Sequence, residues 1–95
     1  MDRYNPPHPG EFIRNIYLEP QKLSYRSTAL KLGVSASTFQ RLIQARSNIS
    51  ATMALRLSKT LGRTAESWLA MQAHYDLWQA KQTLDIGQVQ KLTVA

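Results

Sequence analysis

The segment from residue 35 to residue 44 carries polar side chains where a helix would turn them away from a core. Arg41 could donate two parallel hydrogen bonds to O6 and N7 of guanine, and Gln40 could pair with N6 and N7 of adenine. Small neighbours could contact a thymine methyl group or a sugar. We predict that the base-reading residues are Ser35, Ala36, Ser37, Gln40, Arg41 and Gln44. An exposed arginine alone is as often solvated surface, so this prediction depends on the surrounding elements.

Two short segments flank these residues, and we expect both to contact phosphate groups. The first opens a helix, where backbone N–H groups and the helix dipole favour an anion. The second is a polar loop that could hold a nucleic-acid backbone beyond the groove. The residues concerned are Tyr25, Arg26, Ser27, Arg46, Ser47 and Asn48. By contrast, we expect Arg56, Lys59 and Arg63 to be solvent-facing charges.

Both sets would be positioned by a helix-turn-helix, in which two short helices cross steeply at a tight turn. The crossing requires a small residue in the first helix, and the turn requires a residue that tolerates positive φ. An apolar residue must lie beneath the turn, and the second helix must bury two residues about one turn apart. Residues 25–44 supply these positions as Ala29, Gly33, Val34, Phe39 and Leu42. The second helix would then enter the major groove.

Apolar spacing and capping residues predict an all-α fold of five helices with short connections. The first helix covers residues 9–18, and its apolar stripe is Phe12, Ile13, Ile16 and Tyr17. The other four have Ser24, Ser35, Ser50 and Thr64 as N-caps. The second should bury Ala29, Leu30 and Leu32, and the fifth extends to about Leu84. The predicted organisation is an arm over residues 1–8, a DNA-binding domain over 9–84 and a tail over 85–95.

The long fifth helix has apolar residues on two sides. One stripe is Trp68, Met71, Tyr75 and Trp78, and the other is Leu69, Ala73, Leu77, Ala80 and Leu84. At about 100° per residue the two stripes point in nearly opposite directions. One stripe can pack on the other helices, and we expect the second to form a homodimer interface, extended by Ile86, Val89, Leu92 and Val94. The alternative is that the arm or the tail folds back over the second stripe.

Composition supports a nucleic-acid partner. The 95 residues include 12 Lys and Arg against 6 Asp and Glu, a formal net charge of +6. A basic surface attracts nucleic acid, acidic proteins or anionic membranes. There is no cysteine, which excludes disulfides and thiolate zinc sites and is consistent with a cytoplasmic location. We expect no signal peptide and no membrane span, because no apolar run approaches the ~20 residues that a span needs.

Catalysis is not expected, and no catalytic residue, metal ligand or cofactor is predicted. His8 precedes Pro9 at a helix start, where it should cap the helix or be solvated, and His74 lies far away on the last helix. Glu66 and Asp76 are roughly 15 Å apart along one helix, too far for paired acid–base work.

Five stretches of the chain resemble the HigA-type antitoxins, which are Cro/repressor-type helix-turn-helix proteins also described as virulence-associated protein I-like. They are HPGEFI (8–13), YLEP (17–20), ALKLGVSASTFQRLI (29–43), ISATMALRLSKTLG (49–62) and ESWLAMQAHYDLWQA (66–80). The resemblance implies a bacterial type II antitoxin that represses its own operon as a dimer and binds a HigB-like, mRNA-cleaving toxin. The arm from Asp2 to Pro7 and the first helix are candidate toxin contacts.

The chain departs from the usual family pattern after the second helix of the motif. The common Asn-Gly-Lys-Arg is replaced by Gln44, Ala45, Arg46 and Ser47. Operator sequence therefore does not transfer by resemblance. Two alternatives also stay open: a stand-alone regulator without a toxin, and a helical protein-interaction module that no longer binds DNA.

Overall fold

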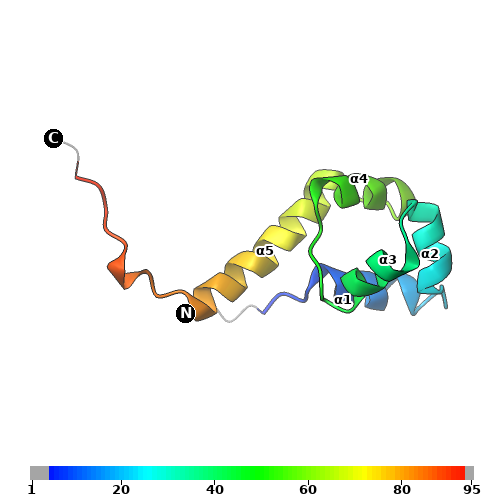
Figure 1. Ribbon diagram of the computed structural model, residues 1–95, viewed down its shortest axis with the longest axis horizontal. Helices are drawn as coiled ribbons and strands as arrows, with labels where there is room; N and C mark the ends of the chain where they lie inside the picture. The colour runs from blue at the N-terminus through cyan, green and yellow to red at the C-terminus, as the bar shows by residue number, and fades with distance from the viewer. Residues whose placement is uncertain (1–4, 94–95) are drawn as a thin grey trace.

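The computed structural model describes residues 5–93, over which every regular element is helical (Figure 1). The elements are α1 (Pro9–Ile13), the π-helical turn η1 (Arg14–Leu18), α2 (Tyr25–Leu32), α3 (Ala36–Ile43), α4 (Ala51–Thr60), α5 (Ala65–Thr83) and the 3-10 turn η2 (Ile86–Gln88). Because η1 continues α1 directly, the predicted series of five helices is confirmed. Residues 1–4 of the predicted arm and residues 94–95 of the predicted tail, including Val94, lie outside the described residues.

Helices α2 to α5 begin at the four predicted N-caps. In each case the side-chain oxygen accepts a hydrogen bond from the backbone N–H three residues later, which satisfies one of the unpaired donors of the first turn. The four bonds are Ser27 N to Ser24 Oγ (3.1 Å), Thr38 N to Ser35 Oγ (3.1 Å), Met53 N to Ser50 Oγ (3.1 Å) and Ser67 N to Thr64 Oγ1 (3.0 Å). His8 caps α1, since its Nδ1 accepts from the Gly10 N–H at 2.9 Å.

The π-helical turn corrects one prediction about the first helix. Ile16 is expected to be buried by regular helical spacing, but its side chain is 54% exposed. The backbone bonds in η1 join residues five apart, as in Glu19 N to Arg14 O. This geometry inserts one extra residue, so the buried positions are Ile13 and Leu18 rather than residues three or four apart. Ile16 is thereby rotated outward.

The turn between α2 and α3 has the predicted geometry. Gly33 adopts a left-handed conformation with φ of 75°, and Val34 N donates to Ala29 O at 3.1 Å. Ala29 is buried at the crossing, and Val34 packs against the core. Leu30, however, is 81% exposed and not buried as predicted. It lies about 100° around the helix from Ala29, on the side away from Leu32.

Arg56 on α4 completes this turn. Its Nη1 donates to Leu32 O at 2.8 Å and to Gly33 O at 3.2 Å. The side chain therefore caps the C-terminus of α2, where a cation and a donor are both favourable. Arg56 is exposed, as predicted, and its contact with the end of α2 is a structural role that the sequence interpretation did not assign. Arg63 also has a structural contact, because its guanidinium lies over the Phe12 and Trp68 rings at 5.4 and 5.5 Å.

The core lies where all five helices meet. Trp68 of α5 is fully buried, and its Nε1 donates to Gly62 O at 2.9 Å. Its ring meets Phe12 and Tyr17 with centroids about 6 Å apart, so aromatic contacts join the N-terminal helix to α5. Phe39 and Leu42 of α3 are buried as predicted. The apolar side of α3 is thus fixed, and its polar side faces outward.

Helix α1 lies in direct backbone contact with the end of α3. A Cβ atom at Gly10 would overlap the Leu42 carbonyl and would lie 3.0 Å from the Ile43 Cα atom. Neither neighbour is a flexible side chain that could move aside. Glycine at position 10 is therefore required by close approach.

Helix α5 extends beyond the compact part of the molecule (Figure 1). The described residues span 57 × 27 × 22 Å. Every residue from Gln79 to Thr83 is exposed, and so is the tail from Leu84 to Thr93. No helix in the described part of the chain is long and apolar enough to cross a membrane.

The C-terminus of α3 ends in a left-handed residue. Ala45 has φ of 61°, and the following Arg46 N donates to Arg41 O at 2.8 Å. This conformation turns the chain away from the helix axis and starts the loop to α4. It is costly for a residue with a Cβ atom, by roughly 1–2 kcal/mol.

Gly10→Ala should destabilise the protein by about 2–3 kcal/mol, because the methyl group forces α1 away from the α3 backbone. The matched control is Gly87→Ala in the exposed tail, which should change stability by less than about 0.5 kcal/mol. Urea denaturation measures both. Equal stability of the two variants would contradict the close contact between α1 and α3.

Ala45→Gly should stabilise the protein by about 0.5–1 kcal/mol, because relief of the left-handed strain outweighs the greater entropy of unfolded glycine. The same substitution at Ala70, an exposed site inside α5, should instead destabilise by about 1 kcal/mol. Thermal and urea unfolding of both variants test the contrast. Loss of stability in both would show that Ala45 is not strained.

Candidate nucleic-acid interface

One edge of α3 presents a row of polar side chains to solvent. Ser37, Arg41 and Gln44 are exposed and lie at successive turns of the helix. The buried residues Phe39, Leu42 and Ile43 lie on the opposite side. Within residues 5–93, the Arg41 guanidinium makes no hydrogen bond to another residue. This edge can donate and accept hydrogen bonds without any rearrangement of the fold.

The side chains of the other predicted base-reading residues are less free to contact DNA. The Ser35 hydroxyl is engaged as the N-cap and lies 2.8 Å from Thr38 Oγ1 and 3.3 Å from Ser37 Oγ. Ala36 and Gln40 are half-buried at the margin of the exposed row. Their side chains border the same edge, so a groove that receives Arg41 would also approach Gln40.

The first predicted phosphate segment lies at the start of α2. Arg26 is exposed and its guanidinium stands 5.2 Å from the centre of the Tyr25 ring. The Ser27 N–H is already used by the Ser24 cap, as is the Ser27 hydroxyl, which lies 2.9 Å from Ser24 Oγ. The groups of this segment that remain free to contact a phosphate are therefore mainly the Arg26 guanidinium and the Tyr25 side chain.

The second predicted phosphate segment is the loop after α3. Arg46 is exposed and Ser47 is half-buried. Asn48 is exposed, but its Oδ1 accepts a hydrogen bond from Gln72 Nε2 at 3.2 Å. The structure thus gives Asn48 an internal role in addition to any contact with a ligand.

Gln72 has no assigned role in the sequence interpretation. It is 5% exposed and accepts from the Ile49 N–H at 2.8 Å, so it joins α5 to the loop after α3. A signal for it exists in the sequence: Gln72 follows Trp68 by one turn and is polar on an otherwise apolar side of the helix.

The two stripes of α5 lie in different surroundings. Trp68 is buried, Met71 packs against the core as predicted, and Tyr75 and Trp78 are half-buried. Every member of the second stripe is exposed, and its three leucines are 37% (Leu69), 56% (Leu77) and 62% (Leu84) exposed. The described tail does not cover it, and His8 of the arm contacts Tyr75 on the body-facing side, with ring centroids 4.9 Å apart.

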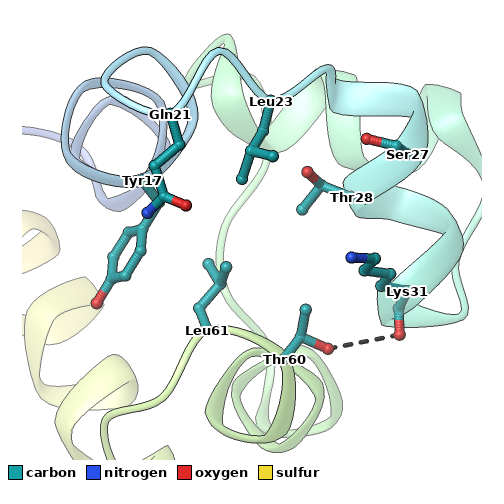
Figure 2. Close-up of a pocket in the computed structure, with 8 residues that line it drawn as sticks. All are labelled: Tyr17, Gln21, Leu23, Ser27, Thr28, Lys31, Thr60 and Leu61. Carbon is teal, nitrogen blue, oxygen red and sulfur yellow. Dashed lines mark hydrogen bonds between the residues drawn. The ribbon is translucent and has the colours of Figure 1, made fainter.

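A cavity of about 330 Å³ lies between η1, α2 and the end of α4. Leu23 and Leu61 point toward each other across it, and Thr60 Oγ1 donates to Lys31 O at 3.4 Å (Figure 2). Its lining residues are Tyr17, Gln21, Leu23, Ser27, Thr28, Lys31, Thr60 and Leu61. No α3 residue lines it, so the cavity is separate from the exposed polar edge.

Comparison with known proteins agrees with this geometry. The helix-turn-helix family profile matches residues 14–69. Virulence-associated protein I of Dichelobacter nodosus is 44% identical over 75 residues, which cover 79% of this chain and 69% of that protein.

Two solved structures match nearly the whole chain. Antitoxin GraA in complex with its operator has 37% identity and a TM-score of 0.88, covering 99% of this chain and 98% of that chain. Pseudomonas aeruginosa antitoxin HigA with the higBA promoter has 32% identity and a TM-score of 0.81, covering 94% and 99%. The chain therefore belongs to the helix-turn-helix family, in the group that contains virulence-associated protein I and the HigA-type antitoxins.

Proposed function

We propose that this protein is the antitoxin of a bacterial type II module, which binds operator DNA as a dimer and represses its own operon. The observation that carries the proposal is the exposed polar edge of α3, with Arg41 at its centre and a basic segment on each side. Two similar proteins are described in complex with operator or promoter DNA, which supports operator binding by this chain. The α3 helix would enter the major groove, as the second helix of a helix-turn-helix does. The test is binding of the purified protein to the DNA upstream of its own gene, against a scrambled duplex. Absence of a preference for the native DNA would refute it.

The exposed stripe of α5 supports the dimer. A single chain of this size leaves Leu69, Leu77 and Leu84 in water, and apolar area of this kind is removed from water when two copies pair. A twofold dimer places two α3 helices on half-sites about 34 Å apart, one helical turn of DNA. The tail residues Ile86, Val89 and Leu92, all exposed, can extend the contact.

The partner protein is a HigB-like, mRNA-cleaving toxin that this chain neutralises. Support comes from the family resemblance and from relatives that are themselves described as antitoxins. Purification of the chain expressed with its neighbouring genes, followed by mass spectrometry, identifies what binds. Recovery of a small basic protein encoded beside it supports the antitoxin role. A chain recovered alone from an operon without such a gene would be a stand-alone regulator.

Arg41→Ala and Arg46→Ala should weaken operator binding in different ways. Loss of Arg41 removes a bidentate base contact, which should cost about 1–3 kcal/mol on the native operator and relax base preference at one position. Loss of Arg46 should weaken binding to all sequences and reduce the salt slope by about one. Fluorescence anisotropy over a range of salt concentrations separates the two. Unchanged binding by Arg41→Ala would exclude it as a base reader.

Leu77→Glu should dissociate the dimer, because a carboxylate would be buried without a partner in the apolar interface. Gln82→Glu introduces the same charge on the opposite side of α5 and serves as the control. Multi-angle light scattering should give a monomer for the first and a dimer for the second. A dimeric Leu77→Glu variant would place the interface elsewhere.

A further inference from the structure

Both polar atoms of the Gln72 amide are hydrogen-bonded, and the residue is buried. Its Oε1 accepts from the Ile49 N–H at 2.8 Å. Its Nε2 donates to Asn48 Oδ1 at 3.2 Å and to Asp76 Oδ1 at 2.9 Å. With 5% of the side chain exposed, water cannot replace these partners easily. The three hydrogen bonds reach two consecutive residues of one loop and one residue of α5 itself.

The loop that Gln72 contacts is the one that follows the predicted base-reading helix. Its first end is fixed by α3, because Arg46 N donates to Arg41 O at 2.8 Å. Its second end is fixed by Gln72 and by the Ile49 side chain, which is 4% exposed in the core. Arg46 and Ser47 lie between these two attachments. Their placement relative to α3 therefore depends on a side chain of α5.

An amide is the only uncharged side chain that serves this position. It must accept from a backbone N–H and donate two hydrogen bonds at the same time. A methionine has nearly the same length but no donor, and it would leave the buried Ile49 N–H unpaired. A glutamate would keep the acceptor but would oppose the Asp76 carboxylate.

We propose that Gln72 is a positioning residue for operator binding, which holds the α3–α4 loop so that Arg46 and Ser47 meet a phosphate beside the groove. The inference rests on the proposed function, because it assigns a role within operator recognition. It also extends that function, because it gives α5 a role in positioning the residues that contact DNA. The other side of the same helix carries the exposed apolar stripe.

The first test compares Gln72→Met with Gln79→Met, the same substitution at an exposed position of α5. Loss of one phosphate contact should weaken operator binding roughly tenfold at about 0.1 M salt and reduce the salt slope by about one. Discrimination between the operator and a single-base variant should stay unchanged, because α3 is not displaced. Amide hydrogen exchange at Ile49 should become faster. Gln79→Met should behave as wild type in all four measurements.

The second test is an isosteric exchange between Gln72 and its hydrogen-bond partner Asp76. Gln72→Glu alone should reproduce the binding defect, since two carboxylates then face each other. The double variant Gln72→Glu with Asp76→Asn has the same net charge as wild type. In this variant the amide at position 76 donates to the carboxylate at position 72, which reverses the wild-type hydrogen bond. Asn48 can rotate its amide so that it also donates to the carboxylate at position 72. Operator affinity and salt slope should both recover.

The outcomes separate this inference from the proposed function. Wild-type protein that does not prefer its operator would refute the proposed function. Wild-type preference for the operator, together with unchanged affinity and salt slope in Gln72→Met despite faster exchange at Ile49, would overturn only the role of Gln72. A lower melting temperature with an unaltered salt slope would also overturn it, because stability alone would then account for the side chain.

Discussion

The backbone of α1 lies directly against the C-terminal end of α3, and the exposed polar edge depends on that contact. Gly10 leaves no room for a side chain between the two helices. The His8 ring caps the same turn of α1, so the helix begins at a fixed point over α3. Because the C-terminal end of α3 lies against the backbone of α1, in addition to the buried side chains of Phe39, Leu42 and Ile43, the outward residues of α3 have little freedom to tilt. A recognition helix requires this kind of rigidity, since each base contact depends on placement within a few tenths of an ångström.

Helix α5 combines two different kinds of surface. On one side Trp68 fills the core and Gln72 reaches the loop after α3. On the other side Leu69, Leu77 and Leu84 face solvent. The proposed dimer contact and the proposed phosphate contact therefore both depend on α5. The distance between two recognition helices in a dimer is then set by one helix from each copy.

Local chemistry made much of the fold predictable. Ser24, Ser35, Ser50 and Thr64 mark helix starts because short polar side chains satisfy the unpaired N–H groups of a first turn. Gly33 marks the turn because it tolerates positive φ. These rules act over three or four residues, so the sequence alone reveals them.

Features that depend on distant partners were not predictable in this way. The outward rotation of Ile16 arises from a π-helical turn that no short-range rule indicates. Arg56 resembles any surface cation until α4 is packed beside the end of α2. The candidate site also has a predictable part and an unpredictable part. The exposed row of α3 follows from helical spacing, whereas the hydrogen bond between Asn48 and Gln72 depends on the tertiary fold.

The projecting end of α5 has a consequence for the lifetime of a single copy. From Gln79 onward every residue of the helix is exposed, so little buried area offsets the entropy of ordering it, and short helices in water are only marginally stable. An unpaired subunit should fray there and expose an unfolded segment of chain to proteases. Pairing would protect the same segment. Cellular concentration would then govern both operator occupancy and turnover, so that a falling level of the protein accelerates its own removal.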